Sequence, residues 1–393
     1  MSHLPARTEA EESLGLSLPH RRMEDWRWTD LRQLIDRPYP PRLAVASAAA
    51  DVARLLAASP FAGIPGQRLV FVNGRHRPDL SQRANGGTTA NRPADGEPIL
   101  AMNAAFADDG ARLSLAGNAD LPIELVFIAS RGEARAIATR NVIEVAAGAS
   151  ATIIETHLGE GSYLTNSVTE MRLGAGARLD RIKFEGEGAN AVHLAHAVAT
   201  LGPGARLADF TLHAGARLSR QNGTYVFEGE EAEARISGAY LLSGRQHVDT
   251  RLVVDHKVPR CLSRELFKCV LDGESRGIFQ GKVIVRPDAQ KTDGKQSSHA
   301  LLLSPNAEFD AKPELEIFAD DVVCGHGATA GDLDSDHLFY LESRGIPAAE
   351  ARALLVAAFV GEAFEAVARE DARLALAAFA EGWLISHGKR PRA

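Results

Sequence analysis

The sequence predicts a mainly β protein, with a β-solenoid core and α-helical regions at both ends. Between residues 121 and 332, short runs of β-branched and aromatic residues alternate with glycine turns. A Gly-Ala phrase begins at Gly148, Gly176 and Gly204 and therefore recurs every 28 residues, which is typical of stacked coils. A β-sandwich remains an alternative, because glycine-rich turns at regular spacing also occur in that fold.

Each Gly-Ala phrase is expected to form a tight turn, because glycine adopts backbone conformations that other residues avoid. Leu179 and Leu207 follow two of these phrases, and Leu218 follows a similar phrase at Gly215; all three are predicted to point inward. Ile182, Phe184 and Phe210 are expected to be their apolar partners. Such coils bury their apolar faces by stacking on one another, so the end coils need a cover.

The first part of the chain, residues 1–120, is predicted to be a mixed, partly helical region. The pattern over 21–35 suits an amphipathic helix, and a second helix is expected over 46–58. Residues 68–72 are typical of a strand. The stretch near 82–98 is rich in Gly, Asn, Thr, Asp and Pro, which predicts a flexible surface loop.

Residues 333–393 are predicted to form a C-terminal helical domain. Apolar residues recur at helical spacing over 347–368 and again over 371–387, with a stop and a new start at Pro347. The apolar faces of these helices are expected either to pack on the solenoid or to dock a partner. The candidate docking residues are Leu338, Phe339, Leu354, Leu355 and Phe359.

Composition narrows the classes of partner. A formal net charge of -7 repels nucleic acid and anionic lipid, so neither nucleic acid nor a membrane is expected as a partner. The three cysteines form no CxxC pair, and the first residues lack the apolar segment of a secretory signal. These features predict a cytoplasmic protein.

The residues Cys324, Gly325 and His326 carry the clearest chemical signal in the sequence. On a strand, residues two apart project from the same face, so a thiolate and an imidazole would lie together. Both are ligands for iron–sulfur centres, zinc or copper. Two ligands do not complete a site, and the rest would come from a partner. The simpler interpretation is structural, because buried cysteines are usually inert small hydrophobic residues.

Enzyme signatures are absent from the sequence: we find no GxxxxGK[ST], GxSxG or HExxH motif and no dinucleotide loop. A β-helical acyltransferase or lyase with His326 as general base is one alternative. A self-contained homodimer that binds metal through Cys324 and His326 of both copies is another.

Several phrases together resemble the SufB/SufD family of iron–sulfur cluster assembly proteins, most strongly over 236–364. They are IFQGK (278–282), DAQKTD (288–293), PELEI (313–317), ADDV (319–322), CGHGAT (324–329) and DHLFYL (336–341). The Cys-x-His phrase is the SufD version, whereas SufB members have a His-Glu-Ala phrase there. Many SufD members have Ser where this chain has Gly325, a change that removes neither ligand.

The resemblance implies a right-handed parallel β-helix that pairs with SufB, and C-terminal helices that receive the ATPase SufC. It implies a scaffold subunit without its own catalytic motif. ATP would be hydrolysed by the partner SufC. By the same resemblance, His326 would hold a nascent iron–sulfur cluster or its iron together with a SufB cysteine, with Cys324 as a secondary candidate. A reduced flavin in the complex, and a homodimer of the isolated chain, are further expectations.

Overall fold

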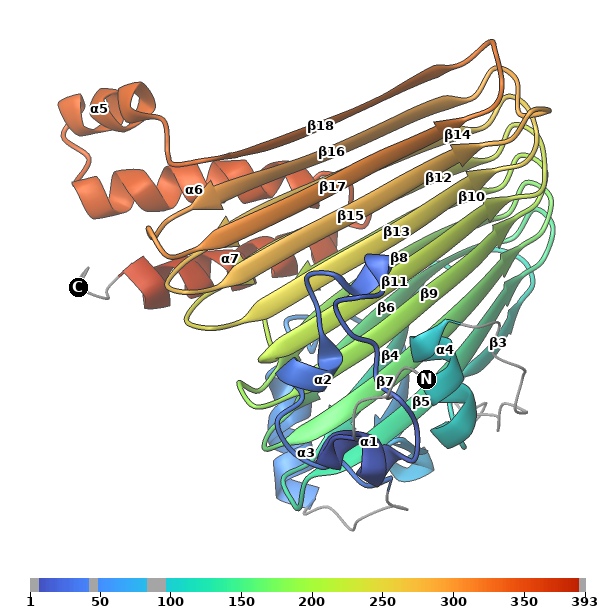
Figure 1. Ribbon diagram of the computed structural model, residues 1–393, viewed down its shortest axis with the longest axis horizontal. Coiled ribbons are helices and arrows are strands. Elements are labelled where there is room, and N and C mark those ends of the chain that lie inside the picture. The colour runs from blue at the N-terminus through green and yellow to red at the C-terminus, as the bar shows by residue number, and fades with distance from the viewer. Residues whose placement is uncertain (1–6, 42–48, 83–96, 389–393) are drawn as a thin grey trace, which may run out of the picture.

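The computed structural model describes residues 7–41, 49–82 and 97–388 and confirms a mainly β, parallel solenoid (Figure 1). The strands are β1 (Gln67–Val72), β2 (Arg75–His76), β3 (Arg112–Leu115), β4 (Ile123–Ala129), β5 (Arg135–Val145), β6 (Ser150–Gly159), β7 (Tyr163–Leu173), β8 (Arg178–Glu187), β9 (Val192–Leu201), β10 (Arg206–His213), β11 (Leu218–Phe227), β12 (Glu233–Leu242), β13 (His247–His256), β14 (Leu262–Leu271), β15 (Arg276–Val285), β16 (Asp293–Leu302), β17 (Glu308–Ile317) and β18 (Val323–Gly331).

Two sheets form the walls of the solenoid. One has the order β18-β16-β14-β12-β10-β8-β6-β4-β1-β2, and the other has the order β17-β15-β13-β11-β9-β7-β5-β3. Neighbouring strands are parallel except for the β1–β2 pair. Successive strands of the chain therefore alternate between the two walls, and each coil pairs with the coils before and after it.

The predicted glycine turns are confirmed. Gly148, Gly176 and Gly204 have φ values of 70°, 64° and 61°, in the left-handed region. A Cβ atom added at any of the three would meet nothing within 4 Å. Glycine is therefore favoured at these corners by backbone conformation rather than by crowding.

The inward direction was predicted correctly for Leu179 and Leu207 and wrongly for Leu218 and for the apolar partners. Leu218 is buried in the cluster that the N-terminal segments form on the outer face of the eight-stranded sheet. Leu179 and Leu207 are buried in the core between the two sheets. Ile182, Phe184 and Phe210 are buried as well, but in a separate cluster on the outer face of the ten-stranded sheet. The physical reason is the two-residue alternation of a strand, which sends residues 179 and 182 to opposite faces.

Two C-terminal helices, α6 (Ala348–Phe364) and α7 (Glu370–Gly388), cover that outer face, so the two helices predicted after Pro347 are confirmed. The helix before them, α5 (Ser335–Ser343), has no buried residue and lies against α6. The ring of Phe184 meets that of Phe379 edge-on with centroids 4.8 Å apart, and Phe210 meets Phe364 at 5.8 Å. Packing on the solenoid, one of the two expected roles of these helices, is thus present.

The N-terminal segments pack on the outer face of the eight-stranded sheet and around the first coils. They are α1 (Glu9–Leu14), the 3-10 turn η1 (Glu24–Trp26), α2 (Leu31–Leu34), α3 (Ala49–Ala57), the 3-10 turn η2 (Pro78–Leu80) and α4 (Pro98–Phe106). The strand predicted over 68–72 is confirmed within β1. The helix expected over 46–58 is present as α3, and its first three residues lie outside the described ones.

The single amphipathic helix predicted over 21–35 is wrong, because η1 and α2 divide that stretch. Tertiary contacts override its helical pattern. Trp26 lies under the Arg220 guanidinium, 4.5 Å from the ring centroid, and the Thr29 hydroxyl donates to Asp249 on β13. The flexible loop predicted near 82–98 lies almost wholly outside the described residues.

None of the described helices is long and apolar enough to cross a membrane. The division into regions 1–120, 121–332 and 333–393 stays a prediction. The strand β1 joins the solenoid sheet from within the first region, by pairing with β4.

Replacing Phe184 by Ala should destabilise the protein by about 3–5 kcal/mol, because the ring is buried between Phe61 and Phe379 and its removal leaves a cavity. Urea unfolding followed by circular dichroism measures the loss. The control is Leu374→Ala on α7, whose side chain is 59% exposed and should contribute little. Equal effects of the two changes would contradict the outward packing.

Candidate metal centre at the open end of the solenoid

The solenoid ends at β17 and β18, each the last strand of its sheet. One edge of each strand therefore has no neighbouring strand among the described residues. Figure 1 shows β18 at the upper edge of the stack, with α5 beyond its end. An unpaired strand edge exposes backbone N–H and C=O groups and is a template for pairing with another chain.

His326 and Cys324 lie on β18, where the sequence analysis expected one shared face. Cys324 pairs in register with Gly294 on β16, and His326 pairs with Gln296. Cys324 packs at the margin of the core between the sheets, so both side chains project from the inner face of the last coil. His326 is exposed and Cys324 is half-buried, because no further coil covers them.

The electrostatic surroundings differ for the two candidate ligands. Burial raises the pKa of the Cys324 thiol above its usual value, which disfavours the thiolate in the isolated chain. A metal ion or a positive charge brought by a partner would reverse that preference. The exposed imidazole of His326 is therefore the more accessible of the two ligands.

A buried polar pair continues inward from His326 along the same row of the sheet. Gln296 Nε2 donates to Glu265 Oε2 at 2.9 Å. Burial raises the pKa of Glu265 to about 7, and the hydrogen bond from Gln296 only partly opposes this effect. The end coil thus rests on a carboxyl group that titrates near neutral pH.

In chemical terms the end coil offers two potential metal ligands, an imidazole and a thiol. Among the described residues, the group of three potential ligands whose atoms lie within 4.8 Å of one another is Glu185, Glu187 and His193, which does not include His326 or Cys324. An imidazole and a thiol on an open coil can share a metal ion with ligands that approach from outside.

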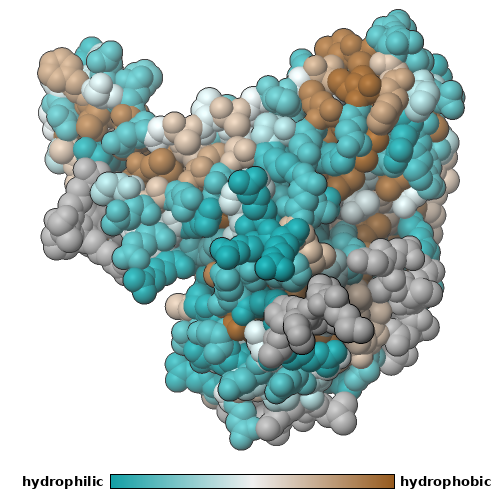
Figure 2. Space-filling view, in the orientation of Figure 1, coloured by the Kyte–Doolittle hydropathy of each residue, from teal (hydrophilic) through white to brown (hydrophobic). Residues whose placement is uncertain are grey.

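An apolar rim borders the open coil. Ile317, Phe318 and Val323 are 41%, 57% and 63% exposed. Figure 2 shows hydrophobic surface at the upper right of the molecule, where Figure 1 places the turn from β17 to β18. Exposed large apolar side chains that cluster in this way are typical of a protein interface.

The predicted docking residues of the C-terminal helices separate into two groups. Phe339 on α5 and Leu354 on α6 are 72% and 47% exposed, whereas Leu338 and Leu355 are half-buried. Phe359 packs against the cluster on the solenoid, with the Lys268 ammonium 4.6 Å from its ring centroid. Phe339 and Leu354 are thus the most accessible of the five side chains.

A polar cluster inside the solenoid was missed by the sequence analysis. Lys183, Glu185 and Glu187 alternate with apolar or small residues along β8 and point inward, where His193 of β9 meets them. The alternation of charge was visible in the sequence. We assigned the inward face to the apolar residues between them, because charged side chains are rarely buried.

The parallel β-solenoid with helices at both ends agrees with one known class of protein. The sequence profile of the SufBD core domain of SUF-system iron–sulfur cluster assembly matches residues 127–359. The chain therefore belongs to the SufBD family of iron–sulfur cluster assembly proteins.

Individual relatives support a SufD-type member. The chain is 30% identical to the iron–sulfur cluster assembly protein SufD of Escherichia coli, over 93% of this chain and 89% of the relative. It is 31% identical to a SufBD family protein of Synechocystis, over 92% of this chain and 86% of the relative. The chloroplastic protein ABCI7 of Arabidopsis thaliana is 31% identical over 60% of this chain and 50% of the relative.

Replacing Glu265 by Gln should stabilise the protein at pH 8 and have little effect at pH 4. The folded state keeps the Glu265 proton up to about pH 7, while the unfolded state loses it near 4.5, so the wild type loses stability as pH rises between these values. The gain at pH 8 is at most about 3 kcal/mol.

Thermal unfolding of both proteins across this pH range measures the difference. The exposed residue Glu308, also near the open end, supplies the control change Glu308→Gln, which should alter stability little at either pH. A Glu265→Gln gain that is the same at pH 4 and pH 8 would show that Glu265 does not titrate in this range.

Proposed function

We propose that this chain is the non-catalytic scaffold subunit of a cytoplasmic SUF complex. In this proposal it pairs with SufB through the end coil of its solenoid and receives the ATPase SufC on its C-terminal helices. ATP hydrolysis belongs to SufC. The observation that carries the proposal is the exposed His326 on the inner face of an unpaired, apolar-rimmed last coil.

The two unpaired strand edges of the end coil support pairing with a partner through this coil. Strands β17 and β18 offer backbone donors and acceptors that a partner strand would satisfy, and Phe318 and Val323 offer apolar area at the rim. A β-solenoid partner with a matching open end would extend both sheets at once. SufB, the paralogue in the same family, has the fold expected for such an end-to-end contact.

The position of His326 supports a shared metal site at that junction. Its imidazole is accessible only from the open side of the coil, because β16 occupies the other side. We infer that His326 and a SufB cysteine hold the nascent iron–sulfur cluster, or its iron, as cargo. Cys324 lies deeper and its pKa is raised by burial, which supports a secondary role.

Docking of SufC is assigned to the outer surface of α5 and α6. Phe339, Tyr340 and Leu354 expose apolar area there, away from the end-coil rim. Because Phe359 is packed on the solenoid, its proposed contribution is to hold α6 in place beneath that surface. Leu338 and Leu355 are half-buried and would contribute at the margin.

A homodimer of the isolated chain is the second candidate, since the same open edges can pair with a second copy. It would bring two His326 and two Cys324 side chains together across one junction. Binding of a reduced flavin by the complex also stays a prediction. Co-expression with SufB and SufC, followed by measurement of the mass and composition of the purified complex, distinguishes the heteromer from the homodimer.

His326→Ala should lower cluster assembly by at least about tenfold, because even the outer partners of metal ligands change affinity by about 10–100-fold. The measurement is the visible spectrum of the co-purified complex after anaerobic reconstitution. Cys324→Ser should have a smaller effect. The matched control is His299→Ala, because His299 lies on the adjacent strand and its ring contacts Thr329. Normal cluster yield from the His326 variant, in an intact complex, would refute its role.

Val323→Asp and Phe339→Asp should separate the two interfaces. Val323→Asp should weaken SufB binding at least about tenfold and leave SufC binding unchanged. Phe339→Asp should weaken SufC binding to the same extent and leave SufB binding unchanged. The reason in both cases is that burying an unpaired carboxylate in an interface costs free energy. Pull-down of each partner with each variant measures this. Leu374→Asp on α7 serves as a control at another exposed apolar residue. Loss of both partners from either variant would contradict separate interfaces.

A further inference from the structure

A second group of potential metal ligands lies inside the solenoid, away from the open end. Glu185 and Glu187 of β8 and His193 of β9 each place a ligand atom within 4.8 Å of the other two. The side chains of Glu185 and His193 are fully buried, and that of Glu187 is 1% exposed. The group belongs to the inner surface of both walls, so the fold brings it together from two strands.

Buried carboxylate oxygens in this group lack well-formed hydrogen bonds. Glu185 Oε1 is buried and has no hydrogen-bond partner among the described residues, and Glu187 Oε2 is buried, with the Tyr163 hydroxyl close to its carboxylate in poor hydrogen-bond geometry. Glu187 Oε2 lies 2.6 Å from His193 Nδ1, yet the arrangement does not meet the angles of a hydrogen bond. Buried carboxylate oxygens without partners are costly, and a bound cation would satisfy them.

The charges around the group leave an excess of negative charge. Glu155, Glu185, Glu187 and Asp209 provide carboxylates, and the cations among them are Arg181 and Lys183. Arg181 is already divided between two of these acids, Glu155 and Asp209. With all four carboxylates ionised and the neighbouring histidines neutral, two negative charges remain, which is the charge that one divalent cation would balance.

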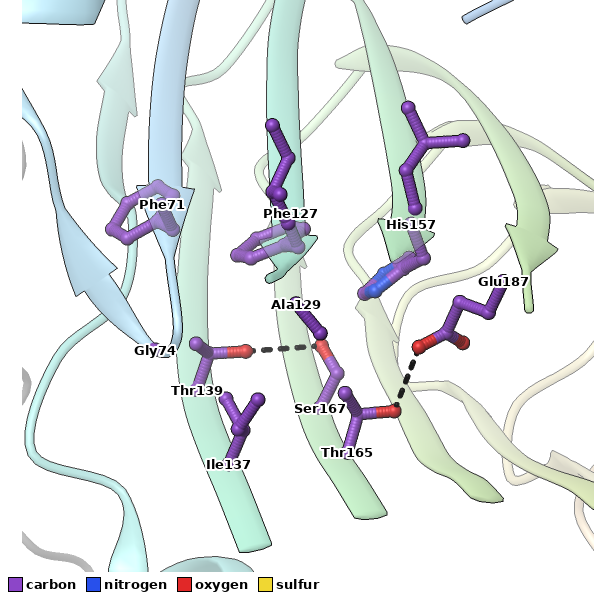
Figure 3. A pocket seen from close by; sticks show the side chains of 12 residues that line it. Phe71, Gly74, Phe127, Ala129, Ile137, Thr139, His157, Thr165, Ser167 and Glu187 are labelled. Carbon is purple, nitrogen blue, oxygen red and sulfur yellow. Dashed lines mark hydrogen bonds between the residues drawn. The ribbon is translucent and has the colours of Figure 1, made fainter. Parts of the chain in front are cut away.

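A small cavity reaches the group from the N-terminal end of the solenoid. It measures about 20 Å³ and is lined by Phe127, His157, Thr165 and Glu187 among others. Figure 3 shows the Glu187 carboxylate beside it, with the Thr165 hydroxyl 3.3 Å from that carboxylate. A space of this size holds about one water molecule and excludes an organic substrate, so it can hold one water ligand of an ion bound by the three side chains.

We propose that Glu185, Glu187 and His193 form an internal binding site for one divalent first-row transition-metal ion. Two carboxylates and one imidazole are a nitrogen and oxygen ligand set that suits Fe²⁺, Mn²⁺ or Zn²⁺ and does not require thiolate. The small cavity provides the place for a water ligand. The site lies five strand spacings from β18, roughly 24 Å, so it shares no ligand with the open end.

Lys183 is the group that competes with the metal ion. Its ammonium lies 2.8 Å from His193 Nε2 and also donates to Gln221 Oε1 at 2.7 Å. A cation at this position repels a metal ion and holds the imidazole by a hydrogen bond. The metal-free form is therefore stabilised by Lys183, and removal of this charge should favour the metal-bound form.

The full chain can be tested with Co²⁺ as the probe, because its visible spectrum distinguishes oxygen and nitrogen ligands from thiolate. After chelator treatment in denaturant, the protein is refolded with Co²⁺ and desalted, and the retained metal is counted by mass spectrometry. Wild type and a Cys324→Ser, His326→Ala double variant should each keep about one equivalent, without a thiolate band. Glu187→Gln and His193→Gln should keep at least about tenfold less.

Glu265→Gln is the matched control, since it removes an interior carboxylate outside the group. It should bind Co²⁺ as the wild type does. Lys183→Met provides a test that does not depend on loss of binding: its Co²⁺ affinity should rise at least about tenfold. The proposal is overturned if wild type keeps no metal, if only the double variant loses it, if both ligand variants retain it, or if Lys183→Met binds no more tightly. Of these outcomes, only loss of metal by the double variant alone bears on His326, because it would assign the bound metal to the open end of the solenoid.

Discussion

The stacking of parallel coils is the constraint on which the whole molecule depends. Each strand satisfies its backbone groups through the coil before it and the coil after it, so the solenoid is continuous from β3 and β4 onward. Only the last coil lacks a successor among the described residues. The same hydrogen-bonding rule that makes the core regular therefore creates one end that another chain can complete.

Because side chains alternate along each strand, the two faces of each wall pack against different neighbours. The outward residues Ile182 and Phe184 of β8, with Phe210 and Leu212 of β10, are apolar and pack under the C-terminal helices. The inward residues combine an apolar core with rows of charged groups such as Arg181, whose ion pairs to Glu155 and Asp209 are buried. The solenoid thus encloses charged side chains between two apolar layers. This arrangement is unusual, because an unpaired charge in a protein interior costs free energy.

The sequence was sufficient to predict whatever depends on local pattern. The glycine corners, the β texture, the C-terminal helices and the shared face of Cys324 and His326 all follow from spacing of a few residues. The direction of Phe184 did not, because it requires knowing that two layers of helix and sheet compete for apolar side chains. The contact of Trp26 with Arg220 did not either, since it joins segments far apart in the chain.

The covering of the ten-stranded sheet by α6 and α7 also has a consequence for synthesis on the ribosome. The ring of Phe379 that shields Phe184 is made about 200 residues later, which takes roughly 10–40 s at ordinary translation rates. During that interval a wide apolar surface is bare. A nascent chain of this architecture would therefore expose a surface that chaperones bind. Premature termination would yield a fragment prone to aggregation.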